Sequence, residues 1–170
     1  MTALAPREVE ALCETVANLY YRLVLVVGPA RSGKTRLLRA TSVTNGWPLI
    51  NLNQRVSEQL LELTQKQRAL RIPRLVDDVL GAAGANIVLV DNIELLFSPD
   101  LAQDPLRLLQ GRARNRTVVA SWPGTMVGNQ LVYAEPGHRE YRRYPNVDTL
   151  WLSLQPRDVI SADPRSQAQS

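Results

Sequence analysis

The sequence predicts an α/β fold in which a mostly parallel, five-stranded sheet lies between two layers of helices. Three observations support this prediction. Short segments rich in valine and leucine alternate with helical patterns along the chain, as expected of strand–helix–strand units. These segments are continuously apolar, which is typical of strands buried on both faces. The length of 170 residues suits a single domain with a sizeable core.

Each predicted strand is a short apolar segment bounded by polar or turn-forming residues. The five core strands are expected at Leu23–Val27, Pro48–Asn53, Asn86–Asp91, Thr117–Ser121 and Val147–Leu154. A short accessory strand is expected at Leu131–Ala134.

The predicted helices follow from apolar residues at helical spacing. They are expected at Pro6–Tyr20, from Lys34 to Ala40, around Val56–Leu61, around Leu75–Leu80 and from Asp104 to Gly111. A break at Ile72–Pro73 separates the third helix from the fourth, because proline disfavours helical conformation at the residue before it. Asp104 is the expected N-cap of the last helix, with Pro105 at its first helical position.

The composition excludes several classes of protein. Cys13 is the only cysteine, so neither an internal disulfide nor a cysteine-based metal site can form. His138 is the only histidine, and no serine-containing nucleophile elbow accompanies it. The apolar segments are too short to span a membrane, so a cytoplasmic location without a membrane partner is expected. Residues 1–154 are expected to form the domain, and residues 155–170 a polar, flexible tail.

The segment from Gly28 to Thr35 matches the phosphate-loop (Walker A) pattern G-x-x-x-x-G-K-[ST] in full, between a predicted strand and a predicted helix. In this pattern the glycines let backbone N–H groups point at phosphate oxygens, and the helix N-terminus adds its positive dipole end. Lys34 is expected to contact the β- and γ-phosphates. The predicted nucleotide-binding residues are Gly28, Arg31, Ser32, Gly33, Lys34, Thr35 and Arg36. The motif narrows the predicted fold to a three-layer P-loop NTPase core.

Asp91 ends an apolar strand, as does the Walker B aspartate that holds Mg²⁺ in P-loop NTPases. We therefore expect Thr35 and Asp91 to be the metal-binding residues, with Asp91 also serving catalysis. An aspartate that caps a turn is the alternative. The expected ligands are ATP and Mg²⁺; ATP is favoured over GTP because the chain has no Asn-Lys-x-Asp segment of the kind that reads guanine.

Two further residues are candidates for catalysis. Many P-loop ATPases have a glutamate directly after the Walker B aspartate, but here that residue is Asn92, and Glu94 is the nearest carboxylate. Glu94 could activate water, or it could be a solvated residue in the first turn of a helix. Asn92 could instead orient water, which would give slow turnover. Ser121 ends the fourth strand, where AAA-type ATPases place a polar sensor of the γ-phosphate; a serine that starts a turn is the alternative.

The net charge is +4, and all but Lys34 and Lys66 of the 20 basic residues are arginine. Two groups stand out: Arg112, Arg114 and Arg116, and then Arg139, Arg142 and Arg143. Each group could supply an arginine finger to a neighbouring subunit's nucleotide, contact DNA phosphates, or form a solvated surface. The second group precedes the last core strand, as the finger does in AAA-type ATPases, so Arg142 and Arg143 are the preferred finger residues. A finger supplied in trans predicts a homo-oligomer.

Several longer segments carry a resemblance to a known family. They are Leu49–Asn53, Val90–Phe97, Asp104–Gln110, Asn115–Gly124 and Tyr133–Tyr144. Through them the chain resembles BrxF, a family of small P-loop proteins of type-three BREX phage-defence systems. The resemblance implies a bacterial defence role beside other BREX proteins, among them a methyltransferase and larger ATPases. Arg31 departs from the usual pattern, since a small residue is common at that position of the loop.

Two functions remain open on these grounds. The first is an ATP-binding and ATP-hydrolysing component of a BREX complex. The second is a nucleotide-gated interaction or DNA-binding module with little or no hydrolysis, which the missing glutamate after Asp91 keeps open. A small-molecule kinase is disfavoured, because neither an arginine-rich lid nor an acceptor site is recognisable. Too few residues follow the fifth strand for a separate helical lid domain.

Overall fold

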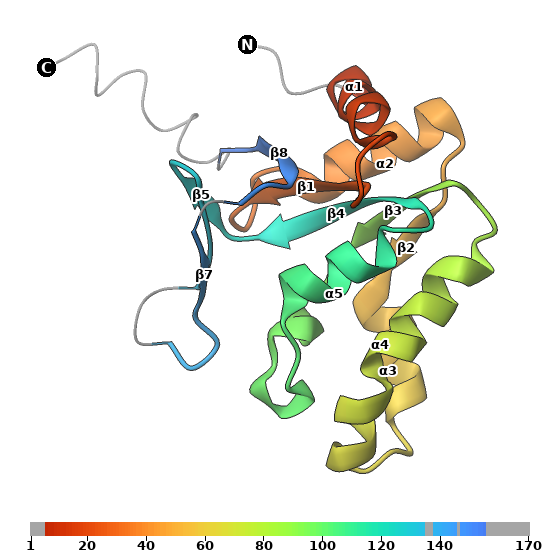
Figure 1. Cartoon of the computed structure of the whole chain (residues 1–170), viewed down its shortest axis with the longest axis vertical. Helices are drawn as coiled ribbons and strands as arrows, with labels where there is room; N and C mark the ends of the chain where they lie inside the picture. Colours follow the sequence, from red (N-terminus) through yellow and green to blue (C-terminus); the bar gives the residue numbers. More distant parts are fainter. Residues whose placement is uncertain (1–5, 135–137, 146, 156–170) are drawn as a thin grey trace, which may run out of the picture.

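A computed structural model describes residues 6–134, 138–145 and 147–155 (Figure 1). At its centre is a five-stranded sheet in which all neighbouring strands are parallel, with the order β2-β3-β4-β1-β8. The strands are β1 (Leu23–Gly28), β2 (Leu49–Asn51), β3 (Ile87–Asp91), β4 (Thr117–Pro123) and β8 (Leu150–Ser153). The predicted α/β fold with a five-stranded parallel sheet is therefore confirmed. β4 lies between β1 and β3, so the two predicted motif strands are separated by one strand.

Helices cover both faces of this sheet. On one face lie α1 (Pro6–Val16) and α2 (Lys34–Asn45); on the other lie α3 (Leu52–Leu60), α4 (Gln65–Ala82) and α5 (Pro105–Arg112), as Figure 1 shows. The alternation along β1 explains the two layers. Val24 and Val26 pack in the core beneath α1 and α2, whereas Leu25 and Val27 pack in the core beneath the other helices. Continuous apolar strands are the consequence of burial on both faces.

A second, antiparallel sheet follows β4. It consists of β5 (Thr125–Val127), β6 (Gln130–Tyr133) and β7 (Arg142–Tyr144), in that order. Its middle strand is the accessory strand that the sequence predicts at Leu131–Ala134. We refer to β5, β6 and β7 as the accessory sheet. Two short 3₁₀ helices, η1 (Glu94–Phe97) and η2 (Pro99–Leu101), connect β3 to α5.

The predicted helix break at Ile72–Pro73 is wrong, because α4 runs without interruption through both residues. Pro73 has no N–H to donate to the carbonyl of Ala69, four residues earlier. That carbonyl instead accepts a hydrogen bond of 2.9 Å from Nε2 of Gln103. A side chain from a distant part of the chain thus replaces the bond that proline removes.

Several element boundaries also differ from the prediction. α1 ends at Val16, four residues before the predicted end, whereas α2 continues to Asn45, beyond the predicted end at Ala40. β2 ends at Asn51 because the Asn51 side chain accepts a hydrogen bond from the N–H of Gln54 and so caps α3. Apart from Gln155, the predicted polar tail lies outside the described residues. Among the helices that the structure describes, none has the length and apolarity needed to cross a membrane.

Candidate functional site

The loop between β1 and α2 has the backbone geometry of a phosphate-binding loop. A Cβ atom on Gly28 would collide with the side chain of Ser32, so only glycine fits where strand and loop meet. Gly33 has a φ of 99°, a left-handed conformation that glycine adopts without strain. No described side chain caps α2 at this point. The N–H groups of its first turn are therefore available to an anion.

The hydroxyl of Ser32 lies inside this loop without a hydrogen-bond partner among the described residues. Ser32 is only 6% exposed. A buried hydroxyl without a partner costs about 1–3 kcal/mol. An oxygen atom of a bound phosphate would supply the missing partner, so the loop fits the group that its sequence predicts.

Lys34 folds back over the loop. Its ammonium group donates hydrogen bonds to the carbonyl oxygens of Gly28 and Pro29, the second at 2.9 Å. Burial lowers the pKa of Lys34, while the negative charges of Glu94 and Asp91 act in the opposite direction. The ammonium group of Lys34 is thus hydrogen-bonded to neutral carbonyl groups. A phosphate oxygen can take their place and form a stronger, charge-assisted hydrogen bond.

Asp91 is the centre of a compact hydrogen-bond group at the carboxyl ends of β3 and β4. Its Oδ2 accepts a bond of 2.6 Å from the Thr35 hydroxyl, and its Oδ1 accepts one of 2.7 Å from the Ser121 hydroxyl. The N–H of Asn92 donates to the same Oδ1 at 3.0 Å. Three predicted site residues, 35, 91 and 121, therefore meet in space. Asp91 is 5% exposed, so these donors compensate for the burial of its carboxyl group.

The arrangement fits magnesium only together with a bound phosphate. Among the described residues, no group of three or more histidine, cysteine, aspartate or glutamate side chains is placed to hold a metal. Thr35 and Asp91 offer two oxygen ligands side by side. Mg²⁺ typically takes one or two protein oxygens and fills its remaining positions with phosphate oxygens and water. The donor set is therefore suitable for a magnesium–triphosphate complex.

Glu94 lies at the same edge of the sheet. It is exposed and begins η1 directly after a turn in which Asn92 adopts a φ of 57°. Its charge is near enough to raise the pKa of Lys34 against the effect of burial. The chain thus turns into a short helix after Asn92, a position that is compatible both with a role of Glu94 in activating water and with a solvated residue in the first turn of a helix.

The two arginines among the predicted nucleotide-binding residues, Arg31 and Arg36, are exposed. Arg31 adopts a φ of 64°, a left-handed conformation that is strained for a residue with a side chain. Arg36 lies on the first turn of α2. Both are placed on the surface of the phosphate loop and its helix, and their contact with a nucleotide stays a prediction.

The predicted finger residues lie in the accessory sheet. Arg142 is half-buried and donates a bond of 2.9 Å from Nη2 to the carbonyl of Gln103, although its buried Nε has no partner in the part of the chain described. Arg143 is exposed. Of the two, Arg143 is thus the one that is accessible to a neighbouring molecule.

The first arginine group lies at the opposite end of the sheet and serves the fold of its own chain. Arg112 and Arg116 both pair with Asp77, at 3.5 and 3.2 Å. The guanidinium of Arg114 lies 4.6 Å from the centre of the Tyr20 ring. These contacts favour a structural role for this group.

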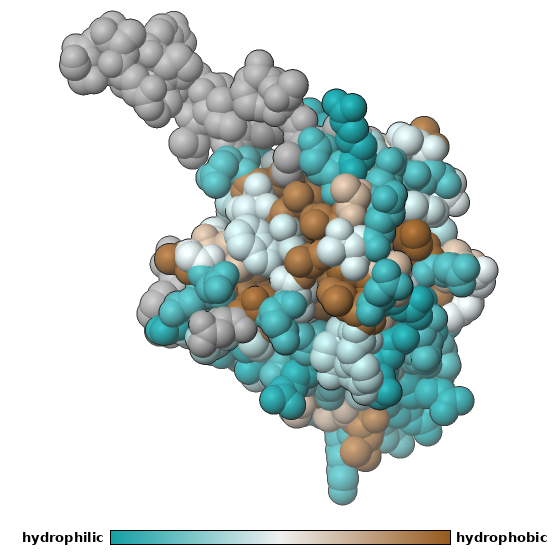
Figure 2. Space-filling model, turned by 45° about the horizontal axis from the view of Figure 1, so that its top comes forward, coloured by the Kyte–Doolittle hydropathy of each residue, from teal (hydrophilic) through white to brown (hydrophobic). Residues whose placement is uncertain are grey.

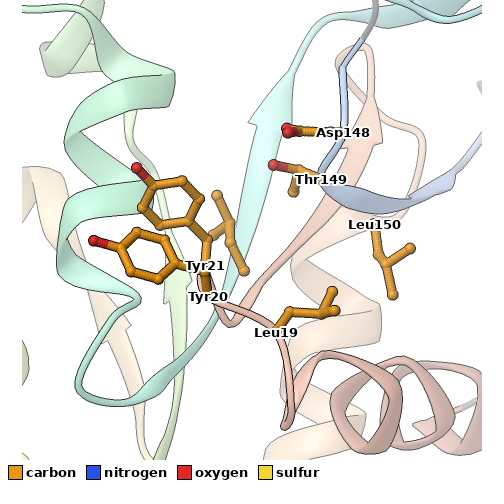
Figure 3. A pocket seen from close by; sticks show the side chains of 7 residues that line it. Leu19, Tyr20, Tyr21, Asp148, Thr149 and Leu150 are labelled. Atoms are coloured by element: carbon orange, nitrogen blue, oxygen red, sulfur yellow. The ribbon is translucent and has the colours of Figure 1, made fainter.

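A pocket of about 200 Å³ also lies at this opposite end. Figure 3 shows the tyrosine pair on one side of it and the segment leading into β8 on the other. Its lining residues are Leu19, Tyr20, Tyr21, Leu23, Asp148, Thr149 and Leu150. Apolar side chains also gather near the middle of the face seen in Figure 2. The pocket is mostly apolar and shares no residue with the phosphate loop, so it is not the nucleotide site.

Comparisons with known proteins give distant structural matches. No protein-family model matches the sequence, and no curated protein matches it. One similar solved structure is PCH-2 of C. elegans, with 14% identity and a TM-score of 0.41 over 96% of this chain and 46% of that one. Another is AMPPCP-bound DnaA from Aquifex aeolicus, with 16% identity and a TM-score of 0.37 over 71% of this chain and 39% of that one. The chain spans less than half the length of either structure.

Proposed function

We propose that this chain binds ATP with Mg²⁺ at the phosphate loop and hydrolyses it. One observation carries the proposal: Asp91 accepts hydrogen bonds from Thr35 and Ser121 at once, beside a glycine-bounded loop. These are the residues that the sequence predicts as metal ligands and γ-phosphate sensor. They meet at the carboxyl ends of parallel strands, which is the edge of the sheet where α/β proteins bind ligands.

With ATP and Mg²⁺ bound, each of the predicted site residues has a separate role. The loop N–H groups and the Ser32 hydroxyl bind phosphate oxygens, and Lys34 exchanges its carbonyl partners for the β- and γ-phosphates. Thr35 and Asp91 would hold Mg²⁺, which would neutralise charge on the phosphates. Ser121, hydrogen-bonded to Asp91, is placed to respond to the γ-phosphate. Glu94 takes a proton from the attacking water as the water oxygen bonds to the γ-phosphorus. The bond between the γ-phosphorus and the oxygen that bridges to the β-phosphate breaks, and ADP leaves with that oxygen. Glu94 then releases the proton to the inorganic phosphate or to solvent.

A specific feature keeps a second function open. Asn92, not a glutamate, follows Asp91, and it is the N–H of Asn92 that bonds to the Asp91 carboxylate. A chain that relies on Asn92 to orient water would bind ATP and turn it over slowly, as a nucleotide-gated interaction or DNA-binding module. The binding chemistry is the same in both functions, and the rate of hydrolysis separates them.

The proposed cellular role and partners rest on the sequence resemblance alone. A BrxF-like protein would work with other BREX proteins in phage defence. Self-association would bring Arg143, which is exposed, to the nucleotide of a neighbouring subunit, while Arg142 supports the accessory sheet. Mixing inactive Lys34→Ala subunits with Arg143→Ala subunits tests this contact. Restored hydrolysis in the mixture supports it, and full hydrolysis by a monomer in light scattering excludes it.

Phosphate release from ATP by the purified chain, with Mg²⁺ and with or without DNA, tests the proposed activity. Wild-type protein is expected to release phosphate, and Glu94→Gln to slow release by about a hundredfold with ATP affinity retained. Equal rates for wild type and Glu94→Gln would remove Glu94 from catalysis. Binding without phosphate release would favour the second function.

A further inference from the structure

The accessory sheet is fastened to the edge of the central sheet that carries the proposed site. β4 holds Ser121 near its end and continues through Trp122 toward β5. The indole N–H of Trp122, which is fully buried, donates to the carbonyl of Val132 on β6 at 3.4 Å. At Gly124, a Cβ atom would collide with the same carbonyl. The accessory sheet therefore packs directly against the end of β4.

The short helix η1 has little stability of its own. It has four residues, from Glu94 to Phe97, and no described side chain caps its N-terminus. A single 3₁₀ turn has poor hydrogen-bond geometry. Its orientation must therefore come from packing, and Phe97 at its end is fully buried. Whatever holds Phe97 also determines where the carboxylate of Glu94 can lie.

Tyr133 of the accessory sheet holds Phe97. The two rings are stacked, with centres 3.8 Å apart and planes 20° from parallel. Trp122 meets Phe97 edge-on at 5.0 Å and completes the support. The Tyr133 hydroxyl donates to Glu140 at 3.3 Å. Burial raises the pKa of Tyr133, and the charges of Glu140 and, to a smaller extent, Glu94 raise it further.

We propose that Tyr133 is a positioning residue for Glu94: its ring, stacked on Phe97, holds η1 so that the Glu94 carboxylate faces the phosphate loop. The inference rests on the proposed function, since it concerns the same hydrolysis. It assigns a task to the accessory sheet, which supports η1 through the stacked rings of Tyr133 and Phe97. Loss of the ring leaves the loop and its phosphate contacts in place and lets η1 turn away.

Tyr133→Leu removes the ring and is the principal test variant. Its phosphate-release rate is expected to fall by about tenfold or more, because small displacements of a catalytic group are costly. Its affinity for ATP and Mg²⁺ in calorimetry is expected to stay close to that of the wild type. Tyr133→Phe keeps the stacked ring and is expected to keep most of the rate. In the double variant Glu94→Gln/Tyr133→Leu, the rate is expected to equal that of Glu94→Gln alone, because both changes remove the same contribution.

Tyr144→Leu is the matched control. Tyr144 lies in the same sheet and meets Trp122 edge-on at 5.7 Å, but its hydroxyl bonds to Asp104 at the start of α5. This variant loses an aromatic ring of the same cluster and is expected to keep its rate. Equal slowing by the two leucine variants, or an effect of Tyr133→Leu that adds to that of Glu94→Gln, would overturn the positioning role. Wild-type protein that binds ATP without hydrolysing it would overturn the positioning role together with the proposed hydrolysis, and absence of ATP binding would overturn the whole proposed function.

Discussion

The two ends of the central sheet carry charged and polar side chains in opposite states of pairing. At the carboxyl end, Lys34 is held only by loop carbonyls in the hydrogen bonds described, and the buried Ser32 hydroxyl lacks a partner within the described chain. At the amino end, Asp77 pairs with both Arg112 and Arg116. In the proposed function an anion completes the first arrangement, whereas the second pairs its basic side chains with a carboxylate of the same chain.

This difference shows why a count of basic residues is a poor guide to function. The amino end has the denser arginine group, yet those arginines stabilise α4, α5 and the start of β4. The carboxyl end has a single lysine, and it is the end at which we propose that phosphate binds. Charge density alone does not mark the proposed site: the amino-end arginines pair with Asp77 of their own chain, whereas the Ser32 hydroxyl beside Lys34 is buried without a partner among the described residues, which is costly unless a ligand supplies one.

The largest difference between the ends is expected for glycine substitutions. Gly28→Ala places a Cβ against the Ser32 side chain and 3.2 Å from the carbonyl of Leu154, so the phosphate loop must change shape. ATP affinity measured by calorimetry is expected to fall by more than about tenfold, or about 1.4 kcal/mol. Gly111→Ala is the control, since Gly111 lies in α5 with open space around it. Unchanged affinity in Gly28→Ala would contradict the assignment of the loop.

The metal-binding role of Asp91 predicts an effect that depends on magnesium. Asp91→Ala is expected to weaken ATP binding more in the presence of Mg²⁺ than in its absence, because the carboxylate is placed near the metal and not near the base. It also leaves the hydroxyls of Thr35 and Ser121 without their acceptor, which costs about 1–3 kcal/mol of stability. Asp91→Asn retains an acceptor oxygen and separates the two effects. Equal losses with and without Mg²⁺ would indicate structural damage only.

Removal of the Asp77 carboxylate at the amino end should lower the stability of the protein and leave its binding of ATP unchanged. Asp77→Ala leaves Arg112 and Arg116 without their shared carboxylate and is expected to lower the free energy of unfolding by about 1 kcal/mol. ATP affinity is expected to be unchanged. Denaturant titration and calorimetry on the same preparation measure both quantities. A fall in ATP affinity would mean that the two ends are coupled.

The smallest expected effect concerns the free energy of unfolding, which should change in opposite directions when a basic side chain is removed at one end of the sheet or at the other. Burial lowers the pKa of Lys34 below 10.5, so folding without a ligand carries a cost for its charged form. Lys34→Met is therefore expected to raise the free energy of unfolding slightly at pH 7. Arg116→Met is expected to lower it, since Arg116 is bonded to Asp77 and to the carbonyl of Arg112.

The advantage of Lys34→Met should also depend on pH. As pH rises through the lowered pKa of Lys34, the native protein loses this proton before the unfolded chain does, so the wild type gains stability. The difference in the free energy of unfolding between wild type and Lys34→Met is thus expected to shrink in denaturant titrations as the pH rises from 7 toward the lowered pKa of Lys34. A gap that widens over this range would show that the charged form of Lys34 stabilises the ligand-free fold.

The parts of the fold that depend on local sequence could be predicted. The three central strands, β1, β3 and β4, follow from their continuous apolar runs, and the phosphate loop follows from its eight residues. The sequence predicts separate roles for Thr35, Asp91 and Ser121 at the carboxyl edge of the sheet, and the structure brings the three side chains into hydrogen-bond contact. Local sequence patterns therefore predict the site residues that lie in the phosphate loop and at the carboxyl ends of the strands.

The remainder depends on contacts between distant segments. Pro73 alone predicts a break in the helix. The break does not occur because the amide of Gln103, which is distant in the sequence, donates to the carbonyl that the proline leaves free. Tyr133 and Tyr144 flank Arg142 in the sequence, but in the structure Tyr133 packs on Phe97 and Tyr144 on Trp122 of the same chain. No local pattern distinguishes a tyrosine that stacks on a ligand from one that stacks on its own chain.

Calorimetric titration of ATP with Mg²⁺ into wild-type protein and Lys34→Ala tests the central claim most directly. Lys34 supplies the charge of the phosphate loop, and its hydrogen bonds in the ligand-free protein go only to loop carbonyls among the contacts described. We predict saturable binding to the wild type and abolished or greatly weakened binding to Lys34→Ala, with both proteins equally folded by circular dichroism. Equal affinity in the two proteins would contradict the proposed nucleotide site.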